Sequence, residues 1–150
     1  MDPAGSEIIT LSIPSRLELL PVLDRLVQGI TEQMEFDEDQ AGDVAMSVIE
    51  AGTNAIQHGH RQDPSKMVEF RFDMFPDHLL VTVRDSGPGF DVSAVLSKDP
   101  TRPEDLLKSC GRGIFIMRAL MDSVEFEIRP QQGTKVQLVK LKRSNGSSPR

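Results

Sequence analysis

Hydrophobic and polar positions follow two different periods along the chain, which predict strands and helices in turn. Glu7–Ile13 alternates apolar and polar side chains and predicts a first strand. Apolar residues then recur at helical spacing in Leu19–Met34 and again in Ala41–Ile56, which predicts two helices with one buried face each. Asp37 can cap the second helix, with Gln40 three residues later as its capping-box partner.

The second half of the chain returns to strand-like patterns. Met67–Phe75 and His78–Arg84 are rich in Val and Phe and predict a β-hairpin. The polar stretch Asp91–Ser109 is too long for a routine connection, and loops of that length are usually functional or disordered. The remaining patterns predict one helix followed by two strands, at Gly113–Asp122, Val124–Ile128 and Thr134–Leu141. This order favours an α+β fold with helices packed on one face of a largely antiparallel sheet.

Length and composition limit the class of protein. The 150 residues fit one domain, expected to span residues 1–143, and the polar Gly- and Ser-containing segment 144–150 is expected to be a disordered tail. A formal net charge of −6 argues against nucleic-acid binding. The single cysteine, Cys110, cannot form an internal disulfide. With no long apolar run for a membrane and no secretory signal, we expect a cytoplasmic protein.

Several well-known site signatures are missing from the sequence. It contains no P-loop and no G-x-G-x-x-G phosphate loop, and neither H-E-x-x-H nor C-x-x-C occurs. The pair His58 and His60 suggests a metal only weakly, and we interpret it as a polar helix end.

The second predicted helix carries the first candidate constellation. Glu50 and Asn54 are one turn apart, so they share a face, together with Asp43, Ser47 and Gln57. The plainer interpretation is a solvated helix face. The functional one is a carboxylate base beside a neutral amide oxygen, a suitable ligand for Mg²⁺ when phosphates supply the other ligands.

A glycine-containing segment after a predicted strand is the second candidate. Asp85-Ser-Gly87-Pro-Gly89 needs no function if it is only a turn. However, an ionised Asp at a strand end can accept a hydrogen bond from an exocyclic amine, and glycines let the backbone approach a planar base. The segment is therefore a candidate adenine site.

The third candidate, Gly111-Arg112-Gly113, opens the last predicted helix. It is either a flexible loop end or an anion site, where free N–H groups of the first turn and Arg112 meet phosphate oxygens. Cations in the preceding polar stretch, at Lys98, Arg102 and Lys108, add charge that could meet a polyphosphate. Thr134 could add a hydroxyl near the base.

Four ordered segments together resemble a known superfamily. They are EAGTNAIQHG (Glu50–Gly59), DSGPGF (Asp85–Phe90), GRGIFIMRALMD (Gly111–Asp122) and GTKVQL (Gly133–Leu138). In this order they resemble the GHKL, or Bergerat-fold, ATPases, and are most similar to the bacterial anti-sigma factor serine kinases. The resemblance implies a two-layer α/β sandwich, the histidine-kinase-like ATPase fold, with helices on one face of a mixed, largely antiparallel sheet.

The same resemblance implies a role for each matching residue. Asn54 matches the Mg²⁺ ligand and Glu50 the carboxylate that activates the attacking hydroxyl. Asp85 matches the aspartate that reads the adenine amine of ATP. The remaining matches are glycines and polar residues around the nucleotide, namely Gly87, Gly89 and Thr134 beside the base and Gly111, Arg112 and Gly113 toward the phosphates.

The resemblance also implies an activity and partners. Such kinases phosphorylate a serine or threonine on an anti-sigma factor antagonist, sequester a sigma factor, and commonly form homodimers. Two alternatives stay open from the residues. The chain could be a binding module without kinase activity, whose binding to a sigma factor or antagonist is gated by ATP. It could also be a histidine-kinase-like catalytic module acting in trans, although the chain lacks a helix pair bearing a phosphoacceptor His.

Overall fold

The computed structural model describes residues 5–59, 63–86, 109–129 and 132–143. These form a five-stranded sheet and a layer of helices. The strands are β1 (Glu7–Pro14), β2 (Met67–Met74), β3 (His78–Asp85), β4 (Ser123–Arg129) and β5 (Gly133–Leu141). The helices are η1 (Leu17–Leu19), α1 (Leu20–Gln33), α2 (Glu38–Asn54), η2 (Ala55–Gly59) and α5 (Ser109–Leu120).

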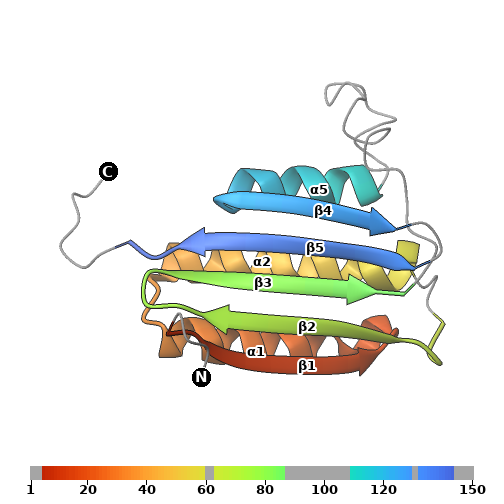
Figure 1. The fold of residues 1–150 in the computed structure, drawn as a ribbon, viewed down its shortest axis with the longest axis horizontal. Coiled ribbons are helices and arrows are strands. Elements are labelled where there is room, and N and C mark those ends of the chain that lie inside the picture. Colours follow the sequence, from red (N-terminus) through yellow and green to blue (C-terminus); the bar gives the residue numbers. More distant parts are fainter. Residues whose placement is uncertain (1–4, 60–62, 87–108, 130–131, 144–150) are drawn as a thin grey trace.

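The strand order in the sheet is β1-β2-β3-β5-β4, and all four neighbouring pairs are antiparallel. The helices α1, α2 and α5 lie side by side behind one face of this sheet (Figure 1). The expected fold, a two-layer α+β sandwich with helices on one face, is confirmed. The expected disordered tail, residues 144–150, lies outside the described residues.

The connection from α1 to α2 shows how local sequence ends one helix and starts the next. The chain turns at Glu35, whose φ of 60° is left-handed. The amides of Glu35 and Phe36 donate to the carbonyls of Glu32 and Thr31, which is a Schellman motif. The Asp37 side chain then accepts a hydrogen bond from the Gln40 amide at 2.8 Å and caps α2 as expected.

The reciprocal half of the capping box is absent, so that part of the prediction is wrong. The buried Gln40 side chain instead donates through Nε2 to the carbonyl oxygen of Leu141, at 2.8 Å. The capping box would use the Gln40 Oε1 as an acceptor, but the side chain is turned toward β5, where its buried Nε2 meets the acceptor that it needs. Gln40 therefore fastens the start of α2 to the end of β5.

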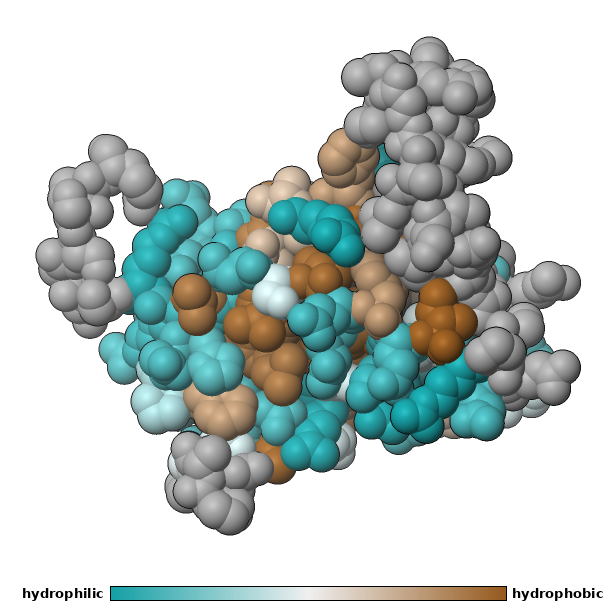
Figure 2. Space-filling view, turned by 45° about the horizontal axis from the view of Figure 1, so that its top comes forward, coloured by the Kyte–Doolittle hydropathy of each residue, from teal (hydrophilic) through white to brown (hydrophobic). Residues whose placement is uncertain are grey.

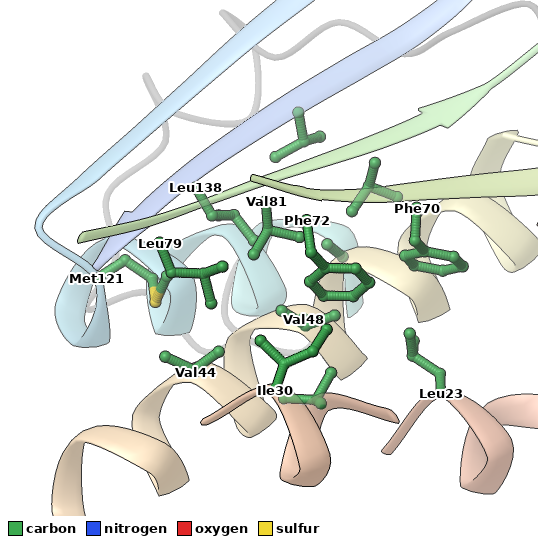
Figure 3. Packing of buried hydrophobic residues seen from close by; sticks show 14 of the residues in the cluster. Leu23, Ile30, Val44, Val48, Phe70, Phe72, Leu79, Val81, Met121 and Leu138 are labelled. Atoms are coloured by element: carbon green, nitrogen blue, oxygen red, sulfur yellow. The ribbon is translucent and has the colours of Figure 1, made fainter. Parts of the chain in front are cut away.

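The core lies between the sheet and the helix layer. Figure 3 shows side chains from both layers pointing toward one another. Strand residues of this core include Phe70, Phe72, Leu79, Val81 and Leu138; helix residues include Leu23, Ile30, Val44 and Val48, and Met121 follows the end of α5. Phe70 and Phe72 are almost fully buried, and each such burial contributes about 1.5–3 kcal/mol.

The opposite face of the sheet carries mostly polar side chains. Thr10, Arg71, Thr82 and Gln137 form one row across neighbouring strands on this open face. Leu80 and Val139 are an apolar register pair beside that row. Figure 2 shows apolar side chains gathered in the middle of the view and bordered by polar ones. Among the described helices, none has the length and apolarity to cross a membrane.

Four chain segments meet at one end of the molecule. The end of α2 with η2, the end of β3, the start of β5 and the first turns of α5 all lie at the right of Figure 1. The structure therefore brings to one end the three segments in which the sequence places candidate chemistry.

Candidate functional site

The polar face of α2 is covered by α5. Ser47 is 0% exposed and Asn54 is 5% exposed, and the two helices pack against each other. The plainer expectation of a solvated helix face is therefore wrong for this stretch. A helix that buries its polar side has to satisfy those groups through neighbours or a ligand.

Glu50 and Asn54 meet α5 at Gly113. A Cβ placed on Gly113 would lie 2.9 Å from Oε2 of Glu50 and 3.0 Å from Nδ2 of Asn54. Real Cβ atoms essentially never approach so closely. Because the position has no side chain, the backbone of α5 can lie directly against the carboxylate and the amide.

The Asn54 side chain has unmet hydrogen-bonding capacity. Both its Nδ2 and its Oδ1 are buried and without a hydrogen-bond partner among the described residues. Leaving such groups unpaired costs about 1–3 kcal/mol each, so an orphaned amide inside a native protein indicates a missing partner. The pair of orphaned atoms identifies this place as one that a polar ligand or ion would complete.

Asp85 and Thr134 form the second half of the site. They are direct register partners, at the last residue of β3 and near the start of β5. The Thr134 hydroxyl is buried and has no hydrogen-bond partner among the described residues. The preceding Gly133 has a φ of 112°, and a Cβ there would overlap the carbonyl oxygen of Asp85. Glycine thus brings the two strand ends together.

A cavity of about 310 Å³ adjoins this pair of strand ends. Asp85, Gly133 and Thr134 line it, with charged side chains from the neighbouring strand positions Arg84, Glu127, Arg129 and Lys135. Arg84, Lys135 and Glu127 are register partners on the open face of the sheet, so this cavity opens on that face and not toward Asn54.

The helix that carries Glu50 and Asn54 connects the two halves. Directly after Asn54 it continues as η2, a single π-helical turn, and η2 contacts both β3 and β5. Such wide turns occur frequently at functional sites because they re-aim side chains within an otherwise regular helix. Asn54 therefore sits where the helix layer meets the strands of Asp85 and Thr134.

The third candidate segment lies inside α5 rather than at its first residue. The helix begins at Ser109, so Gly111 and Arg112 fall in its first turn and Gly113 follows. Arg112 is exposed. The first N–H groups of a helix have no partner within the helix and carry positive partial charge, so this turn can face an anion.

Some expected residues cannot be placed. Gly87, Gly89 and the cations Lys98, Arg102 and Lys108 lie outside the described residues, as does His60. Within the described ranges, no three His, Cys, Asp or Glu side chains gather as a metal site. A magnesium ion at Asn54 would therefore take most of its charge from phosphate oxygens.

The residues at this end fit a nucleotide with its ion. At this end of the described structure, both polar side-chain atoms of Asn54 and the hydroxyl of Thr134 are buried without hydrogen-bond partners. A carboxylate, Glu50, lies against the glycine of a helix whose first turn can receive phosphates. Asp85 is half-buried at the strand end, where it can meet a planar base.

One buried polar residue of β5, which points toward the helix layer, was not singled out from the sequence. Lys140 is 6% exposed, and its Nζ lies 3.0 Å from Oδ2 of Asp43 and 2.6 Å from the carbonyl oxygen of Leu120. A signal was available, because Lys140 occupies the same inward phase of β5 as Thr134, Val136 and Leu138.

Comparison with known proteins identifies the family of the chain. The family model described as the histidine kinase-like ATPase domain matches residues 13–140. The chain therefore belongs to the histidine kinase-like ATPase family.

Proteins similar to this chain over most of its length indicate a particular type of protein within the family. The chain is 30% identical to the serine-protein kinase RsbW of Bacillus subtilis, over 95% of this chain and 89% of that protein. It is 32% identical to the serine-protein kinase RsbW of Bacillus licheniformis, over 91% and 87%. The resemblance to GHKL ATPases of the anti-sigma factor serine kinase type is thereby confirmed.

A solved structure shares the fold. The RsbU and RsbW domains of Rv1364c from Mycobacterium tuberculosis match with a TM-score of 0.67 at 13% identity. The match covers 92% of this chain and 33% of that longer chain.

Proposed function

We propose that this protein is an ATP-dependent serine/threonine kinase that phosphorylates an anti-sigma factor antagonist and also sequesters a sigma factor. The single observation that supports this most is the set of orphaned polar atoms on Asn54 and Thr134, at the end of the molecule where Glu50 meets α5. The relatives named serine-protein kinase RsbW support the choice of a serine as acceptor.

ATP would be held from both halves of the site. Asp85 accepts a hydrogen bond from the exocyclic amine of adenine, with the Thr134 hydroxyl, Gly87 and Gly89 beside the base. The first turn of α5, with Gly111, Arg112 and Gly113, faces the phosphates. The Asn54 amide oxygen is the protein ligand for Mg²⁺, which when bound neutralises charge on the phosphate oxygens.

Glu50 would act as the general base. The acceptor hydroxyl oxygen forms a bond to the γ-phosphorus of ATP while the bond from that phosphorus to ADP breaks. The hydroxyl proton passes to the Glu50 carboxylate. A Cβ at Gly113 would lie 2.9 Å from Oε2 of Glu50, so the glycine keeps a side chain out of that space.

The partners in this proposal follow from the resemblance. A kinase of this type acts in the cytoplasm, commonly as a homodimer, and exchanges a sigma factor for its antagonist. The orphaned groups described above concern the nucleotide, so they support ATP binding more directly than the identity of either protein partner.

Labelled ATP separates the proposal from its alternatives. The protein is incubated with γ-labelled Mg-ATP and its cognate antagonist, and the product is treated with acid. Acid-stable phosphate on a hydroxyl of the antagonist supports the kinase. Acid-labile phosphate on histidine would indicate the trans-acting module instead. Nucleotide binding and sigma inhibition without any transfer, and with inhibition retained in Glu50→Gln, would indicate the ATP-gated binding module.

A further inference from the structure

A buried lysine joins three elements at the end of the helix layer opposite the candidate site. Lys140 projects from β5, and its Nζ forms an ion pair with Asp43 of α2 at 3.0 Å. The same Nζ donates a hydrogen bond at 2.6 Å to the carbonyl oxygen of Leu120, the last residue of α5. A cation at a helix C-terminus is favourable because the free carbonyls there carry negative partial charge.

The contacts of Lys140 lie the same number of residues from the candidate site on both helices. Asp43 precedes Glu50 by seven residues on α2, and Leu120 follows Gly113 by seven residues on α5. Seven residues are two helical turns, or about 10 Å of helix. Asp43 therefore lies on nearly the same face of α2 as Glu50. The two helices run antiparallel and are joined at two levels, through Lys140 at one and through the contact of Gly113 with Glu50 and Asn54 at the other.

We infer that Lys140 is a positioning residue for phosphotransfer. Lys140 fixes the position of α5 along the axis of α2, and through that position it fixes the contact of Gly113 with Glu50. This inference rests on the proposed function. A helix is stiff along its axis, so a shift at Leu120 moves Gly113 by a similar amount. Because the space between Gly113 and Glu50 is too small even for a Cβ, a small slide or rotation of α5 toward α2 changes the position of the Glu50 carboxylate.

If Lys140 only stabilised the fold, an apolar residue at this position would serve as well. Buried ion pairs are often replaced by apolar residues without loss of stability. The inward positions of β5 before Lys140, Val136 and Leu138, are already apolar. A lysine that reaches both a carboxylate on one helix and a backbone carbonyl on the other specifies a geometry, which an apolar side chain does not.

Amide hydrogen exchange tests the inference without reference to catalysis. In the unliganded protein, Lys140→Met should lower protection at Gly113 and Ile114 at least tenfold, two turns from the substituted contact. Val81 in β3 serves as the reference for global unfolding. Arg118→Met removes an exposed cation from the same end of α5 and should leave Gly113 protected. A loss confined to the last turn near Leu120, or one equal to that at Val81, would overturn the inference.

A kinetic cycle tests the connection to Glu50. Lys140→Met should lower the kcat of phosphotransfer at least tenfold. In the double variant with Gly113→Ala, the fall in kcat should be much smaller than the product of the falls in the two single variants, because both changes displace the Glu50 carboxylate. Asp43→Asn, which keeps an oxygen for Lys140, provides a milder variant if Lys140→Met does not fold. Fully multiplicative losses would overturn the inference. If the wild type transfers no phosphate, the proposed function fails, and the exchange experiment still decides the role of Lys140.

Discussion

Gly113 of α5 lies so close to Glu50 of α2 that a Cβ on the glycine would be 2.9 Å from the carboxylate oxygen Oε2. The contact brings together two residues 63 positions apart in the sequence (113 − 50). A Cβ at this position would therefore displace the Glu50 carboxylate, because a flexible side chain moves more easily than the backbone.

Gly113→Ala should therefore impair transfer without unfolding the protein. Alanine is favoured over glycine inside a helix by about 1 kcal/mol, which offsets the local clash. We expect at least a tenfold fall in phosphotransfer with an unchanged or higher urea midpoint. Ala119→Gly, an exposed position on the same helix, should do the reverse and lower stability while leaving transfer intact. Wild-type rates in Gly113→Ala would show that Glu50 does not need this contact.

Asp85→Asn should weaken ATP binding by more than tenfold. The substitution removes a charge-assisted hydrogen bond, worth about 1.5–3 kcal/mol, and tenfold in affinity corresponds to about 1.4 kcal/mol. Asp77→Asn makes the same change in the turn at the opposite end of β3, where the carboxylate is exposed, and should leave affinity unchanged. Calorimetric titration with ATP measures both. Equal affinity in the two variants would remove Asp85 from the adenine site.

Thr134→Val should stabilise the free protein and weaken nucleotide binding at once. The buried hydroxyl has no partner among the described residues, and replacing it with a methyl group of similar size removes a cost of about 1 kcal/mol. Denaturant unfolding without ligand and ATP titration measure the two effects. The reference is Thr82→Val, a buried threonine on the open face of β3. A Thr134→Val protein that is less stable, with full affinity, would contradict a ligand-facing hydroxyl.

Asn54→Ala should remove the effect of Mg²⁺ while leaving metal-free nucleotide binding largely in place. The variant lacks the amide oxygen proposed as the metal ligand but keeps Asp85 and Thr134. ADP affinity is titrated with and without Mg²⁺, and the ratio should approach one. Ser47 is also buried, two turns earlier on α2, and its hydroxyl has no partner within the described ranges; Ser47→Ala should keep the wild-type ratio. An unchanged ratio in Asn54→Ala would place the metal elsewhere.

Local sequence signals predicted most of the secondary structure. The Asp37 cap, the hairpin of β2 and β3 and the two last strands were confirmed, because capping, turn chemistry and alternation depend on neighbours in the chain. The helix α5 begins at Ser109, four residues before the expected Gly113, since glycine lowers helix propensity without preventing a helix.

Contacts between residues far apart in the sequence could not be predicted from the sequence pattern. The polar face of α2 looks like a solvated surface in sequence because nothing local indicates that α5 will cover it. Two further contacts could not be predicted for the same reason. Gln40 bonds Leu141, which is 101 residues away in the sequence, instead of completing the capping box, and Lys140 pairs with Asp43 across 97 residues. The resemblance to GHKL ATPases assigned roles to Glu50 and Asn54, and the structure added their contact with Gly113.

Single-turnover transfer from γ-labelled ATP to the antagonist tests the kinase proposal most directly. Wild type and Glu69→Gln, an exposed carboxylate on the open sheet face, should place acid-stable phosphate on one serine or threonine at equal rates. Glu50→Gln should bind ATP with similar affinity and transfer at least a hundredfold more slowly, within the usual contribution of a general base. Equal rates in Glu50→Gln and wild type, or no transfer by a wild type that binds ATP, would contradict the proposal.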